Sequence, residues 1–470
     1  MAALAWPLAS QSVLSYIQGT MSIAFVGQLG AQSLSATVLG NSVFNVMGLS
    51  VMVGISQGLE TLCGQAYGAK RYTALGHYLQ QGLALCSLFS LGCLGAFLQA
   101  PRLLAALGQD PEIARMAGEF LVWMIPALYG DILVECLRRY LVAQNQVHVS
   151  NVGAGVSALC TPALLWLFVF RLDLRVRGAA LATALAYWIN ALVHLCYVAR
   201  FRGAHNRCWP GFSRRAFSGW RLYLGIALPA TAMLCAEWWT FEILIILSGL
   251  LPSPEVALSA VGVGFQVDVL IFMPTLGFSG ALSTRVSNSL GALRPRTARR
   301  AAAIATGLTV ATSAVAAIGL LASRPQVARV FSPEPEVVAA TTAVLLPVAV
   351  TCFGDAWQSA LAGLLRATRR TGTGAVVAFC SYYLVGIPTA YYFAFRAGLG
   401  APGLWWGLAC ASNLAMPVFC VIFSTIDWGK EAHRSKELHE HDGEEGAGAG
   451  AGGGEMGKAL GAVETELSRV

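Results

Sequence analysis

The chain repeats itself with an offset of about 224 positions, and this internal duplication restricts its fold more than any other feature. The matching positions are spread along the whole length: Pro7 with Pro229, Gly68-Ala69 with Gly291-Ala292, Tyr129-Gly130-Asp131 with Phe353-Gly354-Asp355, and Gly178 with Gly403. The offset drifts by only about three positions between the first and last match. The duplication therefore involves a whole fold and not one motif.

Each half carries apolar stretches long enough to cross a bilayer as helices. Of the 470 residues, 56% are hydrophobic and only 12% are charged, which is typical of an integral membrane protein. The expected spans are about 4–26, 38–60, 78–100, 119–141, 151–170, 176–199, 222–249, 256–281, 298–322, 337–363, 373–396 and 402–426. Six spans per half predict an all-α fold with twelve transmembrane helices. Its two six-helix lobes, 1–200 and 222–426, are joined by a loop at 201–221 and related by a pseudo-twofold axis along the membrane normal.

The basic residues of the short connections predict the orientation. Most of them, including Lys70, Arg71, Arg138 and Arg370, fall on one side if the N-terminus is cytoplasmic. Both termini are then cytoplasmic. This bias explains the net charge of +7 without nucleic-acid binding, since no soluble basic domain is present. We expect a monomer in the lipid bilayer of the plasma membrane or of a vacuolar or other internal membrane. The charged and Gly-rich tail, 427–470, is expected to be disordered, with a regulatory contact as the alternative.

Ionisable side chains inside a membrane are costly, so each one indicates a function or a partner. The spans contain six deep carboxylates, with Glu60 nearer an inner end: Asp131, Glu135, Glu237, Glu242, Asp268 and Asp355. No Lys or Arg is expected deep in any span. Without such a partner, a buried carboxyl group can carry a proton or bind a cationic substrate.

Glu237 is the strongest candidate because the matching position of the first half is Ser15. Its neighbours Trp238 and Trp239 offer aromatic faces to a flat or cationic substrate. The alternative is that these tryptophans are packing or interfacial residues. Glu242 lies five positions further on, about 140° around the helix, so it need not share the same cavity.

Asp355 is the second candidate, with Gln358 three positions later on the same helical face. Gln358 could hydrogen-bond the carboxylate or a substrate; alternatively, it satisfies a structural aspartate. Asp268, near Gln266, is a secondary candidate without a visible partner.

The carboxylates of the first half have basic neighbours instead. Asp131 is followed by Glu135 and then by Arg138 and Arg139, which form a ladder on one face that can neutralise Asp131. We therefore expect Asp131, Glu135 and Arg139, together with Glu60, to have gating or structural roles.

Two related motifs, Glu60–Gly68 and Ser283–Ala292, carry a resemblance to a known family. Supporting segments are Phe25–Gly30, Leu137–Gln144, Gly178–Thr183, Cys235–Trp239 and Tyr382–Pro388. Over about residues 4–426 the sequence resembles the multidrug and toxic compound extrusion (MATE) family, and within it the eukaryotic branch, particularly the plant detoxification type.

The resemblance implies a secondary antiporter that exports organic cations, xenobiotics or metabolites in exchange for protons, or for sodium in some bacterial members. It also implies two lobes splayed as a V and an acidic cavity in the second lobe, with Glu237 and Asp355 as its acids and Glu242 as a further match. The first span has no acid, so a first-lobe proton site of the prokaryotic kind is not expected.

Two other classes of function fit the sequence less well. A lipid or lipid-linked flippase is the alternative, although it would favour a basic cavity, whereas the deep charges here are acidic. An enzyme is not expected, because HExxH, GxSxG and P-loop motifs are missing from the sequence. His77, His148 and His194 have no ligand-like spacing, so neither a metal site nor a cofactor is predicted.

Overall fold

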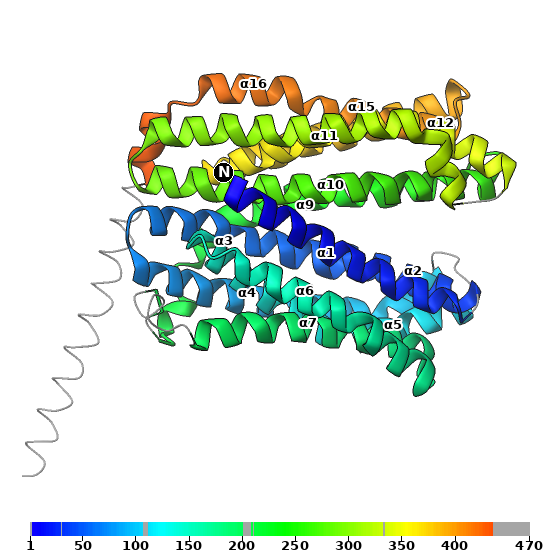
Figure 1. The fold of residues 1–470 in the computed structure, drawn as a ribbon, viewed down its shortest axis with the longest axis horizontal. Coiled ribbons are helices and arrows are strands. Elements are labelled where there is room, and N and C mark those ends of the chain that lie inside the picture. The colour runs from blue at the N-terminus through cyan, green and yellow to red at the C-terminus, as the bar shows by residue number, and fades with distance from the viewer. Residues whose placement is uncertain are drawn as a thin grey trace, which may run out of the picture.

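The computed structural model describes residues 2–29, 31–106, 111–200, 208–209, 211–331 and 334–435, and most of them are helical (Figure 1). The first half forms α1 (Ala2–Gly27), α2 (Ala31–Val43), the π-helix η1 (Phe44–Leu49), α3 (Ser50–Gly68), α4 (Tyr72–Ala106), α5 (Pro111–Ala143), α6 (His148–Leu165), the π-helix η2 (Trp166–Arg171) and α7 (Arg175–Arg200). No strand occurs in these ranges. Helices satisfy every backbone polar group internally, as a lipid environment requires.

The second half repeats this order after a short 3-10 helix, η3 (Arg214–Phe217). Its elements are α9 (Trp220–Ser248), α10 (Pro254–Gly291), α11 (Pro295–Phe331), α12 (Pro335–Ala367), α13 (Thr371–Phe379), η4 (Cys380–Gly386), α14 (Ile387–Tyr391), η5 (Tyr392–Arg396), α15 (Ala401–Asn413) and α16 (Ala415–Thr425). The matched helices α5 and α12 both have 33 residues and both begin at a proline. The predicted all-α fold of two six-helix lobes is confirmed.

Eleven helical segments of the described residues are long and apolar enough to cross a membrane. The remaining predicted span corresponds to α1, a helix of 26 residues whose polar side chains lower its hydropathy. Those side chains have partners on both sides: Gln18 donates to Ser157 of α6 at 2.6 Å, and the Tyr16 hydroxyl donates to Gln266 of α10. Helix α1 therefore lies between the lobes, which explains why it is less apolar than the others.

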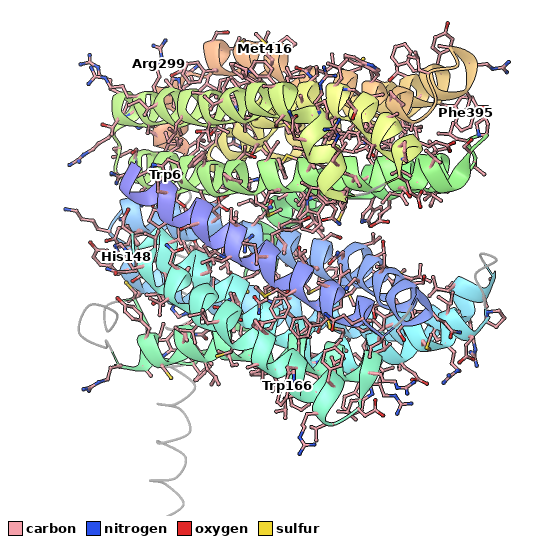
Figure 2. The ribbon with its side chains drawn as sticks, turned by 45° about the vertical axis from the view of Figure 1, so that its right-hand side comes forward. Trp6, His148, Trp166, Arg299, Phe395 and Met416 are labelled. Carbon is pink, nitrogen blue, oxygen red and sulfur yellow. The ribbon has the colours of Figure 1, made fainter. Side chains whose placement is uncertain are left out.

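Most core residues of each lobe pack within that lobe, and a smaller cluster that includes Leu8, Val142, Phe278 and Ala281 joins the lobes near one end of the bundle. We call this end the basic end; it carries the turns at 69–71, 144–147, 292–294 and 368–370 and the side chain of Arg299 (Figure 2). From there the helices of the two lobes diverge toward the end that carries Phe395, as in a V (Figure 2).

Two glycines related by the repeat allow this close approach. A Cβ atom on Gly68 would lie 2.0 Å from the backbone oxygen of Asn288, and one on Gly291 would lie 2.0 Å from that of Gln65. Any side chain at either position would force α3 and α10 apart. The paired motifs of the sequence therefore meet each other across the lobe boundary.

The start of the expected disordered tail is ordered. Residues 428–435 are helical, Glu431 pairs with Arg370 at 2.6 Å, and the ring of Trp428 lies 5.7 Å from that of Phe423. The second lobe thus extends to at least residue 435. Residues 436–470 and 201–207 of the predicted tail and loop lie outside the described residues.

Candidate functional site

Three buried carboxyl groups from three different helices come together inside the second lobe. Glu237 of α9, Asp268 of α10 and Asp355 of α12 are 8%, 1% and 3% exposed. Asp268 and Asp355 are in hydrogen-bonding contact, and Glu237 interacts electrostatically with both. We call these three residues the acidic cluster. Asp268, which the sequence offered only as a secondary candidate, connects the other two.

Helix α12 presents the cluster because residues three or four positions apart share a face. Cys352 and Asp355 lie on that face, and the Cys352 thiol donates to Oδ1 of Asp268 at 3.2 Å. One turn after Asp355, the Ser359 hydroxyl donates a hydrogen bond to the Thr275 carbonyl of α10 at 3.0 Å. The Ser359 carbonyl in turn accepts a hydrogen bond from the Ser279 hydroxyl of α10 at 2.6 Å. These bonds fix the register of α12 against α10 and so hold the two aspartates together.

The acidic cluster has no salt bridge within the described part of the chain. The nearest cation that acts on it is the guanidinium of Arg366, which interacts electrostatically with Glu237. The side chain of Tyr382 is buried and interacts electrostatically with all three carboxyl groups. Three carboxylates cannot all be ionised side by side in a water-poor site without a compensating positive charge. That charge is a proton or a bound cation.

The other residues predicted for this site lie outside the cluster. Glu242 is only partly buried and has no hydrogen bond or ion pair with the described residues. Trp238 is partly buried, whereas Trp239 is 39% exposed and donates to the Val46 carbonyl of the first lobe at 3.3 Å. Trp239 thus bridges the lobes.

Gln358 is buried, but it does not hydrogen-bond Asp355 as the spacing suggested. The partners of Asp355 are Asp268 and the hydroxyl of Ser412 on α15, since the carboxylate turns toward those helices. The spacing of Asp355 and Gln358 on α12 gives the two residues a common face, but it does not identify which neighbouring helix each one meets.

A second group of charges joins the lobes at the basic end. Glu60 of α3 forms an ion pair with Arg366 of α12 at 3.6 Å, and each side chain is 9% exposed. Around this pair, Arg366 Nη2 donates to Ser279 at 2.9 Å, and the Thr61 hydroxyl donates to the Arg366 carbonyl at 2.8 Å. Arg366 lies beyond the predicted span limit at 363, close to the end of α12 at Ala367, where α12 buries it against the first lobe.

The ladder in α5 also differs from the expectation. Glu135, and not Asp131, binds both arginines: Arg138 at 2.8 Å and Arg139 by a short contact. Asp131 is 4% exposed, and its Oδ2 atom has no hydrogen-bond partner. Arg139, which is 4% exposed, also acts electrostatically on Glu60 and so connects this group to the lobe boundary.

Comparison with known proteins agrees with this architecture. A family model described as MatE matches residues 7–167 and 229–392, one segment in each lobe. Protein DETOXIFICATION 17 of Arabidopsis thaliana is 37% identical over 434 residues, covering 92% of this chain and 90% of that protein. Protein DETOXIFICATION 16 of the same plant is 36% identical, covering 92% and 89%. The crystal structure of the eukaryotic MATE transporter AtDTX14 superposes with a TM-score of 0.89 at 32% identity, covering 93% of this chain and 97% of that one.

Proposed function

The chain belongs to the MatE family of multidrug and toxic compound extrusion transporters, and we propose that it is a secondary active antiporter that exports organic cations, xenobiotics or secondary metabolites in exchange for protons. The acidic cluster carries this proposal. It offers up to three negative charges in a buried site without a salt bridge among the described residues, and both proposed cargoes, a proton and an organic cation, are positive.

Exchange follows from competition for the same carboxylates. A cationic substrate that enters displaces protons from Glu237, Asp268 and Asp355, and protonation from the more acidic side releases the substrate. The available driving force is about 1.4 kcal/mol per pH unit. A net charge that moves through 100 mV adds about 2.3 kcal/mol. Together these suffice for concentrative export at a simple stoichiometry.

Arg366 couples the acidic cluster to the contact between the two lobes. It interacts electrostatically with Glu237 inside the second lobe and with Glu60 across the lobe boundary. An ionised Glu237 competes for this guanidinium, whereas a protonated Glu237 leaves it to Glu60. Protonation of Glu237 therefore strengthens the hold of Arg366 on Glu60 at the lobe boundary, and loss of the proton weakens it. The cluster stays in one lobe while the lobes alternate around it.

The orientation is part of the proposal. The basic residues at the turns support an orientation with the basic end and both termini on the cytoplasmic side. The membrane that we propose is the plasma membrane or a vacuolar or other internal membrane. In this orientation the V opens away from the cytoplasm, which is the state that releases substrate. We propose that the transporter works as a monomer, because each chain contains both lobes.

The test is uptake of the fluorescent cation ethidium by proteoliposomes under an imposed pH gradient. We expect Glu237→Gln, Asp268→Asn and Asp355→Asn to abolish pH-driven uptake while the proteins remain folded. Glu242→Gln is the matched control on α9, since this acid lies outside the cluster, and it should transport normally. Normal transport by all three cluster variants would refute the proposal.

Two further arms separate the alternatives. A sodium gradient in place of the pH gradient tests the coupling ion. Transfer of a labelled phospholipid between leaflets, combined with an absence of ethidium uptake in the wild type, would favour the flippase alternative.

A further inference from the structure

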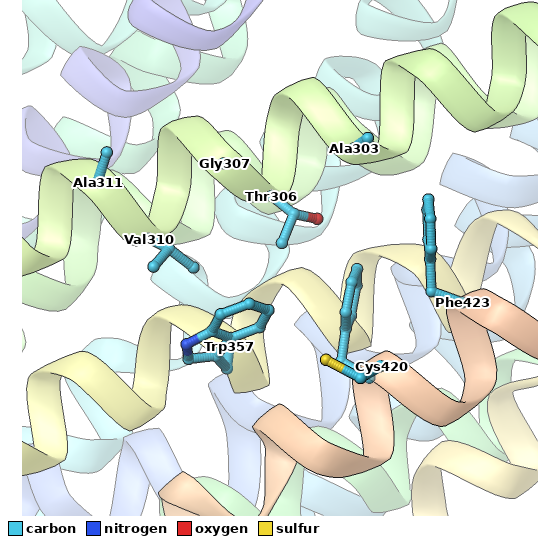
Figure 3. A pocket seen from close by; sticks show the side chains of 9 residues that line it. Ala303, Thr306, Gly307, Val310, Ala311, Trp357, Cys420 and Phe423 are labelled. Carbon is cyan, nitrogen blue, oxygen red and sulfur yellow. The ribbon is translucent and has the colours of Figure 1, made fainter.

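A groove runs along the face of the second lobe that is turned away from the first lobe, between α11, α12 and α16 (Figure 3). Its volume is about 520 Å³. Small residues of α11 at a spacing of four, Ala303, Gly307 and Ala311, form one wall, and the rings of Trp357, Phe419 and Phe423 form the opposite wall. Because α11, α12 and α16 belong to membrane-spanning segments, this groove faces lipid.

A threonine that lines the groove has a covered hydroxyl group that the protein leaves without a hydrogen-bond partner. Thr306 is 5% exposed and lines the groove, yet its Oγ1 atom makes no hydrogen bond. Threonines in a helix commonly bond to the carbonyl four residues earlier. Thr309 and Thr312 of the same helix do so, each at 2.8 Å. The indole nitrogen of Trp357 is also buried without a partner. Such groups are costly in hydrocarbon unless a ligand satisfies them.

A positive charge lies at one end of the same groove. The guanidinium carbon of Arg299 is 6.0 Å from the ring centre of Phe423, which lines the groove. Arg299, Ala303 and Thr306 are separated by four and three residues, so they follow one another along one face of α11. From Arg299 to Thr306 the helix rises about 10 Å.

We propose that this groove binds one phospholipid of the surrounding membrane. An acyl chain lies along the small residues of α11, and the phosphate binds Arg299. Rotation of the Thr306 side chain brings its hydroxyl, which is covered in the structure, to an ester carbonyl oxygen that accepts its hydrogen bond. A phospholipid carries an anionic phosphate and two ester carbonyls at one end of an apolar chain, which matches the charge, the unpartnered donors and the apolar walls. A sterol carries a single hydroxyl and cannot satisfy Arg299 and Thr306 together.

Two glycines of α11 provide a matched pair of variants. Gly307 lines the groove, whereas Gly319 lies further along the helix, and a Cβ atom at either position would have nothing within 4 Å. Leucine at either position raises helix propensity to the same extent. Only Gly307→Leu fills the groove.

The readout is native mass spectrometry of the full-length protein after delipidation and titration with palmitoyl-oleoyl phosphatidylglycerol. We expect the wild type and Gly319→Leu to bind one tightly held lipid that Gly307→Leu loses. Thr306→Val, which keeps the shape and removes the hydroxyl, should weaken binding about threefold to tenfold. Arg299→Gln should also weaken it.

Equal binding by Gly307→Leu and Gly319→Leu would overturn the proposal. So would an unchanged affinity of Thr306→Val together with unchanged affinity of Arg299→Gln. Cholesterol, titrated in parallel, should not displace the phospholipid; displacement would show that the occupant is a sterol instead.

Discussion

Neutralising Glu60 should open the basic end of the transporter. In the structure its carboxylate lies 3.6 Å from Arg366 across the lobe boundary, and each side chain is 9% exposed. With an effective dielectric constant of 20, this separation corresponds to a gross attraction of about 5 kcal/mol. The Glu60→Gln variant would leave Arg366 and the neighbouring Arg139 facing each other without this anion. Loss of one partner of a buried pair typically costs about 3–5 kcal/mol.

Only the state in which the lobes meet at the basic end bears this cost, because separation of the lobes lets water reach Arg366. A bias of about 3 kcal/mol changes the ratio of closed to open states by about 150-fold. Hydrogen exchange of the protein in nanodiscs measures this shift. Peptides covering 60–68 and 283–291, which line the contact between α3 and α10, should exchange faster in Glu60→Gln than in the wild type.

The matched control is Glu112→Gln, which removes an exposed ion pair with Arg115 at 2.7 Å. This pair lies at the start of α5, away from the basic end. An exposed pair contributes little, so exchange at the basic end should not change. The double variant Glu60→Gln/Arg366→Gln tests the pair itself, since its effect should be smaller than the sum of the two single effects. Additive effects, or unchanged exchange in Glu60→Gln, would refute the assignment.

Two further predictions concern contacts of the second lobe. Gly291→Ala places a Cβ atom 2.0 Å from the Gln65 backbone oxygen and should lower both the melting temperature and the transport rate. Gly307→Ala is the control, because its Cβ atom has open space around it and should change neither quantity. Equal melting curves of the two variants in a thermal shift assay would contradict this prediction. Arg370→Gln removes the 2.6 Å contact with Glu431 and should increase proteolytic cleavage within 428–435, with no change in ethidium transport; an unchanged cleavage rate would show that the contact does not hold this helix.

Much of the fold could be predicted from the sequence because the repeat and the apolar spans act over long distances. Twelve spans, two lobes and the importance of Gly68 and Gly291 follow from patterns that do not depend on where each helix begins or ends. What a helix does beyond its apolar stretch is harder to predict, since a long helix can bury a polar end against protein. Arg366, for example, lies beyond the predicted span 337–363, and the longer helix α12 buries it at the lobe boundary.

The site was predictable in part. Glu237 and Asp355 come together, and the carboxyl group of Asp268 connects them. Spacing along one helix shows which residues share a face, but it does not show which helix packs there. The placement of Asp268 depends on the register of α10 against α12, and the turn of Trp239 toward Val46 depends on the other lobe. Neither is encoded by a local pattern.

The broken symmetry of the repeat contained more information than the sequence argument used. The comparison that selected Glu237 against Ser15 applies equally to Glu60, whose counterpart is Ser283, and to Arg366, whose counterpart is Val142. These three charges lack an equivalent in the other half, and the structure connects them, since Arg366 interacts with both glutamates. A duplicated fold supplies two equal lobes that can rock against each other. Charges found in only one of them let protonation within a lobe act on the contact between the lobes.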